Sequence, residues 1–122
     1  MLIHKTFVAA AVALTVTAVW AEPAVVFKDG QYHLWEATRS DGWDRIIYAT
    51  AVDPRGPWTK HGVAVDAGSW EVGAHPDVVY DPERDLWLMA WLGTSGPNKG
   101  QLMLHTAQQP EGPWSAYPAN PF

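Results

Sequence analysis

The stretch Thr50-Ala51-Val52-Asp53-Pro54-Arg55-Gly56-Pro57-Trp58 returns 56 residues later as Thr106-Ala107-Gln108-Gln109-Pro110-Glu111-Gly112-Pro113-Trp114. At this offset Trp35 falls on Trp91, and eight of the 24 positions from 35 to 58 are identical. Upstream the offset drops to 53, which places 23–27 on 76–80 and assigns the three-residue change to the longer turn 81–85. Such self-similarity indicates a tandem array of one supersecondary unit. We therefore expect Trp35 and Trp91 to occupy equivalent places.

The first copy contains four short strand patterns separated by turn residues. Val25–Phe27 and Tyr32–Ala37 flank Asp29-Gly30, the strongest short-range hairpin signal. Arg45–Val52 and Trp58–Val65 follow, divided by the Pro- and Gly-containing turn 53–56. In the second strand Tyr32, Leu34 and Glu36 would lie on one face, with His33, Trp35 and Ala37 on the other.

The second copy repeats this order and fixes the fold class. Its expected strands are Asp77–Tyr80, Leu86–Leu92, Gln101–Ala107 and a fourth that begins at Trp114. Four antiparallel strands per repeat of this length are typical of β-propeller blades. The alternative is a small β-sandwich, which gives no reason for ordered self-similarity at a fixed period. The prediction is an all-β chain of two four-stranded antiparallel blades.

The composition and net charge of the chain indicate which binding partners are not expected. The chain has 122 residues, a net charge of −5 and no cysteine. The negative charge argues against a nucleic acid or an anionic membrane as partner. The five histidines have no metal-ligand spacing, so neither a metal nor another cofactor is expected.

The first 21 residues read as a secretory signal peptide. A weakly basic start precedes the apolar run Phe7–Val19, and Val19-Trp20-Ala21 resembles a cleavage site. A membrane anchor is the alternative, but the run is shorter than the roughly 20 residues that span a bilayer. The expected mature chain, 22–122, is secreted or periplasmic.

The quoted motifs resemble those of a known family. An apolar strand, Asp29-Gly30, an aromatic strand, Tyr48-Ala49-Thr50 and Gly56-Pro57-Trp58 are similar to a blade of glycoside hydrolase family 43 and its family 32 and 130 relatives. The resemblance covers about 22–117 and implies a five-bladed propeller. It implies that this chain is the front of a longer protein, with one blade at about 22–66 and another at about 75–122.

The topology of a propeller blade predicts which residues would line the central cavity. The innermost strand of each blade begins on the face where the central cavity opens, together with the loops between the second and third strands and between blades. The turns at Asp29-Gly30, 53–56 and 109–112 would then lie on the opposite face, and Trp58 and Trp114 would pack between blades. The residues expected at the cavity are Glu22, Trp43, Trp70, Glu71, His75 and Asp77.

The resemblance assigns roles to these residues. Family 43 enzymes invert configuration with a carboxylate base and a carboxylic acid. Glu22, directly before Pro23, matches the position of the base, although the family has Asp there. His75 and Asp77, two apart in a strand, would point to one side, where Asp77 would act as base or tune the acid. The alternative is that no cavity lies on that side. Asp77 is then an exposed residue at the start of a strand, and His75 is a loop residue without a role in binding.

The remaining site residues would bind sugar. His75 and Glu71 would hydrogen-bond hydroxyl groups, while Trp70 and Trp43 would stack on a sugar ring or be partly buried under loops. The general acid would be a Glu of a later blade. The prediction is a glycosidase acting on polysaccharide or oligosaccharide. A non-catalytic carbohydrate-binding or structural propeller, or a truncated gene product without function, remains as an alternative.

Overall fold

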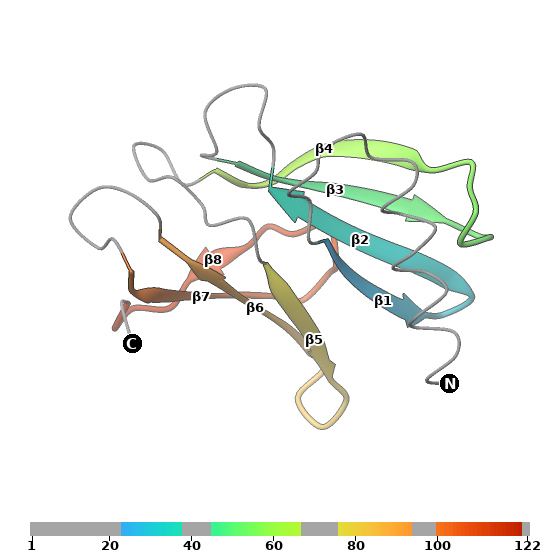
Figure 1. The fold of residues 1–122 in the computed structure, drawn as a ribbon. Coiled ribbons are helices and arrows are strands. Elements are labelled where there is room, and N and C mark those ends of the chain that lie inside the picture. The colour runs from blue at the N-terminus through green and yellow to red at the C-terminus, as the bar shows by residue number, and fades with distance from the viewer. Residues whose placement is uncertain (1–22, 38–44, 67–75, 94–99, 121–122) are drawn as a thin grey trace.

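The structure, a computed structural model, describes residues 23–37, 45–66, 76–93 and 100–120. These residues form eight strands in two four-stranded antiparallel sheets (Figure 1), and they contain no helix. Accordingly, no helix in these ranges is long and apolar enough to cross a membrane. The strands of the first sheet are β1 (Ala24–Lys28), β2 (Gln31–Ala37), β3 (Arg45–Ala51) and β4 (Thr59–Asp66). Those of the second are β5 (Asp77–Asp81), β6 (Leu86–Leu92), β7 (Leu102–Ala107) and β8 (Ser115–Ala116).

Each sheet is a meander in which neighbours in sequence are neighbours in space. The Asp29-Gly30 turn joins β1 to β2 with φ values of 54° and 76°, a left-handed conformation that Asp tolerates and Gly adopts freely. The turn after β3 is closed by the Gly56 amide, which donates to the Asp53 carbonyl, and Gly112 repeats this bond with Gln109. The repeated sequence is thus a repeated turn.

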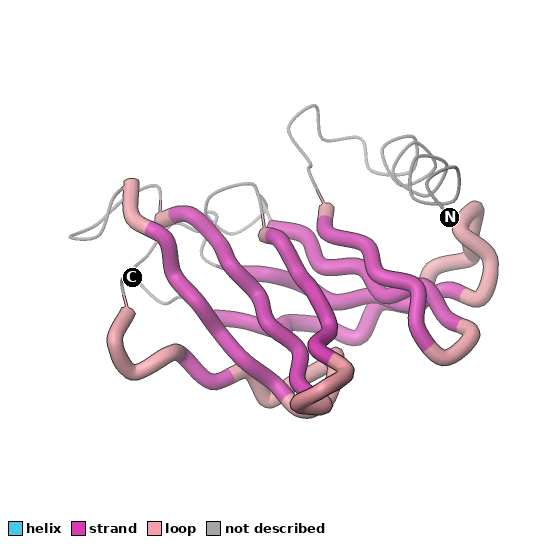
Figure 2. Tube along the Cα trace, turned by 90° about the horizontal axis from the view of Figure 1, so that it is seen from below, coloured by secondary structure: helices cyan, strands magenta, loops and turns pink. Residues whose placement is uncertain are grey.

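The two sheets pack face to face around one shared core. Alternation along β2 places His33, Trp35 and Ala37 on one face and Tyr32 and Leu34 on the other, as predicted, and the structure shows that the first set faces the second sheet. We call these the packed and the outward face of the first sheet. Trp35 has no exposed surface, and its ring centroid lies 5.5 Å from that of Trp87. Figure 2 shows the sheets as separate layers along the Cα trace.

The expectation that Trp35 and Trp91 are equivalent is wrong. Tyr32 pairs with Ala51 in the first sheet, whereas Trp87 pairs with the corresponding Ala107 in the second. Trp91 therefore takes the place of Glu36, and Ala90 takes the place of Trp35. The two Trp residues belong to opposite faces of their own sheets, and both are buried in the shared core.

This exchange of faces between the two copies arises because two connections in the second copy are longer than those in the first. The turn between β1 and β2 has two residues, and the turn between β5 and β6 has four, from 82 to 85. The third extra residue falls between β6 and β7, not in that turn. The interval from Ala37 to its partner Ile46 is one residue shorter than that from Leu92 to its partner Leu102. Because side chains alternate at every residue, a one-residue shift exchanges the two faces of the strand.

The repeated Trp58 and Trp114 separate in the same way. Trp114 packs against the shared core, with its ring edge-on to Trp35, and both indole N–H groups donate to the carbonyl of Pro110. Trp58 packs on Tyr32 and Leu34 at the outward face of the first sheet. Packing between blades is thus confirmed for Trp114, and it stays a prediction for Trp58, which lies on the face of the first sheet that does not meet the second.

Candidate functional site

Of the six residues predicted to line the cavity, the structure describes Asp77. Its side chain is exposed at the first position of β5. Asp77 pairs with Ala90, so it points away from the first sheet, on the same side as Val79 and Leu88. The other five, Glu22, Trp43, Trp70, Glu71 and His75, lie outside the described residues, so their roles stay predictions.

Asp77 lies at the opposite end of its sheet from the repeated turns. It pairs near the end of β6, whereas the turn 82–85 follows the far end of β5. The turns containing Asp53 and Gln109 follow β3 and β7 at this far end as well. The chain therefore has a turn end, where hairpins meet, and a second end where β1 and β5 begin (Figure 1).

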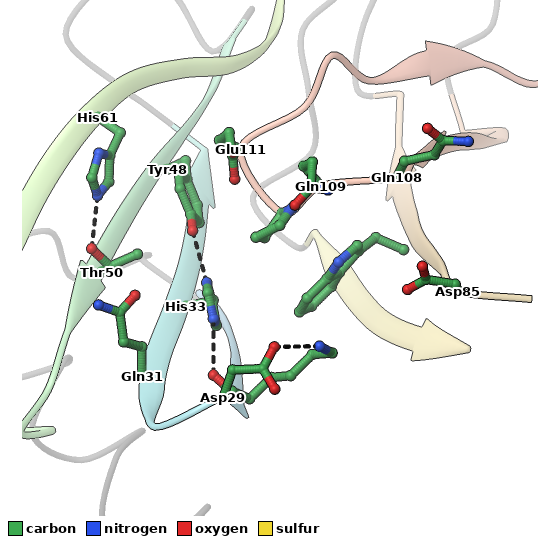
Figure 3. A pocket seen from close by; sticks show the side chains of 13 residues that line it. Asp29, Gln31, His33, Tyr48, Thr50, His61, Asp85, Gln108, Gln109 and Glu111 are labelled. Atoms are coloured by element: carbon green, nitrogen blue, oxygen red, sulfur yellow. Dashed lines mark hydrogen bonds and ion pairs between the residues drawn. The ribbon is translucent and has the colours of Figure 1, made fainter. Parts of the chain in front are cut away.

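A cavity of about 630 Å³ opens at the turn end, where both sheets contribute to its walls. We call it the turn-side cavity. Its lining is largely polar, and Figure 3 shows the side chains gathered around it. Its lining residues are Lys28, Asp29, Gln31, His33, Tyr48, Thr50 and His61 from the first sheet, and Asp85, Trp87, Gln108, Gln109, Pro110 and Glu111 from the second.

A buried His–Tyr pair forms the back of this cavity. Tyr48 Oη lies 2.7 Å from His33 Nδ1, and His33 Nε2 lies 3.3 Å from the Lys28 carbonyl (Figure 3). A neutral imidazole satisfies both contacts when Nε2 donates to the carbonyl and Nδ1 accepts from the phenol. Burial lowers the pKa of His33, which favours this neutral form.

Tyr48 is held in its protonated form. Burial, followed by the nearby Glu111 carboxylate, raises the pKa of Tyr48 to about 12. Its ring stacks on His33, and His61 lies beside it, with His61 Nε2 2.7 Å from Thr50 Oγ1. The pair is therefore a neutral hydrogen-bonding unit at neutral pH.

The rim carries more negative than positive charge. Lys28 Nζ lies 2.5 Å from Asp29 Oδ2 and 4.4 Å from the centroid of the Tyr80 ring. The Tyr80 hydroxyl donates to Asp85 Oδ1 at 2.5 Å, and Glu111 adds a third carboxylate. Carboxylates, amides and hydroxyls in this arrangement can exchange hydrogen bonds with a hydroxyl-rich ligand, and the excess of carboxylates disfavours an anion.

The sequence pattern did not identify this cavity. It correctly separated His33 from Tyr32 by face, and it marked the surrounding turns as structural. The cavity arises because turns of two sheets meet, which depends on how the sheets pack. Among the residues described, no group of three or more His, Cys, Asp or Glu side chains is placed to hold a metal ion.

No family model and no curated protein matches the sequence. Solved structures do match. An exo-β-1,3-galactanase from Phanerochaete chrysosporium aligns with 85% of this chain at a TM-score of 0.69 and 16% identity. An endo-1,4-β-xylanase from Bacteroides thetaiotaomicron aligns with 83% at a TM-score of 0.68 and 21% identity. A family 43 β-xylosidase/α-arabinofuranosidase from a compost microbial metagenome aligns with 80% at 0.64 and 17% identity.

The fold is that of the family 43 β-propeller. The two sheets are its blades, and the blade prediction is confirmed over the sandwich alternative. This chain spans 26%, 34% and 34% of the length of those three structures. At these identities the likeness shows the fold.

Proposed function

We propose that this chain supplies two blades of a secreted glycoside hydrolase-like protein that acts on polysaccharide or oligosaccharide. The observation that carries the proposal is the match of both blades, in order, to solved galactanases, xylosidases and xylanases. Asp77 supports it, because an exposed carboxylate at the start of an inner strand is free to meet a ligand. The apolar segment before Glu22 supports secretion.

The proposed site lies at the end of the blades where β1 and β5 begin. There Asp77 acts as the base or holds the charge that tunes an acid, with Glu22 as a second candidate base. An inverting pair needs its two carboxyl groups roughly 6.5 to 9.5 Å apart, with room for water on one side of the sugar. His75, Trp70, Glu71 and Trp43 are proposed to bind the sugar through hydroxyl hydrogen bonds and ring stacking.

Binding of defined oligosaccharides tests this proposal. Isothermal titration calorimetry of the 122-residue chain against β-1,3-galacto-, β-1,4-xylo- and arabino-oligosaccharides should detect binding of at least one. Asp77→Asn, which keeps size and removes charge, should weaken that binding by about tenfold, the equivalent of one charge-assisted hydrogen bond of roughly 1.4 kcal/mol. Asp53→Asn, at the turn end, is the matched control and should leave it unchanged.

Two results would count against the proposed function. One is the absence of binding to every sugar tested by a chain whose near-ultraviolet circular dichroism shows ordered aromatic side chains. The other is equal weakening by Asp77→Asn and Asp53→Asn, which would place the sugar away from the start of β5.

A further inference from the structure

The turn-side cavity lies at the end of the molecule that the proposed function leaves unused. Asp77 marks the other end, where β1 and β5 begin, so the cavity is separate from the proposed active site. Its volume of about 630 Å³ falls within the roughly 300 to 1,000 Å³ of most small-molecule sites. The first sheet forms one wall, and the turn 108–111 of the second sheet forms the wall opposite (Figure 3). The cavity is therefore large enough for a ligand, and two blades are needed to build it.

A β-bulge brings His61 to the wall of the first sheet. The pairing of β3 with β4 slips by one residue at His61, which makes His61 the extra residue of the bulge. Gly62 follows with a φ of 98°, and a Cβ there would meet no atom within 4 Å, so conformation and not packing explains this glycine. The His61 ring lies 5.1 Å from that of Tyr48, and its Nε2 lies 2.7 Å from Thr50 Oγ1. The local irregularity of β4 thus adds an imidazole to the lining of the cavity.

The mouth of the cavity carries polar side chains that the protein itself does not engage. The side chains of Gln31, Gln108, Gln109 and Glu111 are exposed there, and within the described ranges none of them makes a hydrogen bond or an ion pair. Each amide can donate and accept, and the carboxylate accepts. At the back, the Tyr48 hydroxyl gives its proton to an imidazole and keeps its lone pairs as acceptors. Donors and acceptors therefore remain available to a ligand on both walls.

This mixture of groups favours a neutral, hydroxyl-rich ligand over an ion. The Lys28 ammonium is paired with Asp29, so the carboxylates of Asp85 and Glu111 give the cavity an excess of negative charge that disfavours an anion. A cation would meet these carboxylates, but it gains nothing from the amide N–H groups and is repelled by Lys28. A sugar hydroxyl donates and accepts at one atom, so it can use the amides, the carboxylates and the phenol together.

We propose that the turn-side cavity is a second carbohydrate-binding site, which holds a short segment of a neutral oligosaccharide. Gln109 and Glu111 on one wall, and Gln31 and His61 on the other, hydrogen-bond its hydroxyl groups. Because Asp77 lies at the opposite end of the blades, this site binds sugar without taking part in the reaction. Its role is to keep a polysaccharide on the protein. That role rests on the proposed function, whereas binding in the cavity does not.

An NMR titration of the isotope-labelled 122-residue chain separates the two proposed sites, because each backbone amide reports its own surroundings. At least one of the β-1,3-galacto-, β-1,4-xylo- and arabino-oligosaccharides should shift the amide signals of Gln31, Gln109 and Glu111 in a saturable way. The same shifts should persist in Asp77→Asn. Shifts at Asp77 and Val78 report the site at the start of β5 instead.

Two substitutions at exposed positions test the cavity without changing the core. Glu111→Ala and His61→Ala should each raise the dissociation constant measured at the cavity by about fivefold, as expected for the loss of one hydrogen bond. Glu83→Ala is the control for the carboxylate, because Glu83 is exposed in the turn between β5 and β6 and does not line the cavity. Lys60→Ala, next to His61 and also exposed outside the cavity, is the control for the imidazole. Both controls should leave the dissociation constant unchanged.

Inorganic phosphate and spermidine test the class of ligand. Neither should shift the amide signals of the cavity residues at a concentration at which the sugar saturates them. A response of these signals to phosphate or spermidine, and to none of the sugars, would overturn the proposal and assign the cavity to an ion.

The position of the shifts distinguishes failure of this proposal from failure of the proposed function. Shifts confined to Asp77 and Val78 would overturn the second site and support the proposed function. Shifts confined to the cavity would support the second site and count against the proposed function. Equal weakening by Glu111→Ala and Glu83→Ala, or no shift at either end in a well-dispersed spectrum, would also overturn the second site.

Discussion

The two sheets share a strand order, but they bring different residues to their shared core. The first sheet brings a polar pair, His33 and Tyr48, and the fully buried Trp35 to the interface. The second brings Trp87, Met89 and Trp91, and Trp91 Nε1 donates to His105 Nδ1 at 3.1 Å. Opposite faces of one repeated unit meet in this interface, so each face has its own composition. Identical residues in the two copies therefore predict which turns are equivalent, but they do not predict which core residues are equivalent.

The largest expected effect is on stability, and it compares the substitution of Trp35 by Ala with that of Trp58. Trp35→Ala should lower the free energy of unfolding by about 3 to 5 kcal/mol, because it empties a fully buried site between the sheets. Trp58→Ala should cost about 1 to 2 kcal/mol, because Trp58 is partly exposed on an outward face. Urea denaturation followed by circular dichroism measures both values. Equal losses would mean that the outward face is as well packed as the shared core.

A second test compares the two copies of the repeated turn. Gly56 and Gly112 have φ values of 94° and 105°, which strain any other residue by roughly 1 to 3 kcal/mol. A Cβ on Gly112 would lie 2.9 Å from Trp114 Cδ1, against 3.2 Å from Trp58 Cδ1 for Gly56. Gly112→Ala should therefore cost more stability than Gly56→Ala, near the upper and lower ends of that range. The reverse order in the same denaturation assay would show that the second turn adjusts more easily.

The strands and their faces could be predicted because the determinants are local. Alternation, Asp29-Gly30 and the Gly-Pro turns placed every strand to within one or two residues. The register between the copies could not be predicted, because the identities at offset 56 hide a change in two separate turns. The turn-side cavity could not be predicted either, since it joins His33 to Glu111 across two sheets.

The pH dependence of stability compares two histidines that face the shared core, the buried His33 of the first sheet and the partly buried His105 of the second. Burial lowers the pKa of His33 and of His105 below the ordinary 6.5. Between these lowered pKa values and 6.5 the unfolded chain binds more protons than the folded chain. The contribution of the two histidines to stability is therefore complete above about pH 7 and is lost as pH falls from 6.5 through the lowered pKa of the folded state. His33→Gln and His105→Gln should each flatten this loss.

Two carboxyl groups with shifted pKa values do not disturb this comparison of the histidine variants. Burial raises the pKa of Glu36, which has the opposite effect at lower pH, but Glu36 is present in every chain tested. The Arg55 hydrogen bonds hold the pKa of Asp53 at about 2, so its contribution is lost only in more acidic solution. His61→Gln, at an exposed position, is the matched control. A pH profile that is identical in both variants and in the parent chain would contradict the assignment of this loss to the interface histidines.

The smallest expected effect is in catalysis, where we predict no turnover by the 122-residue chain. Inversion needs an acid and a base on opposite sides of the sugar, separated by roughly 6.5 to 9.5 Å. The two sheets offer Asp77 and, by prediction, Glu22, both candidates for the base, and the resemblance places the acid on a later blade. Assays on aryl arabinosides and xylosides, with Asp77→Ala alongside, measure this. Turnover that disappears in Asp77→Ala would show that two blades are enough, because only an active site containing Asp77 would lose activity with that carboxylate.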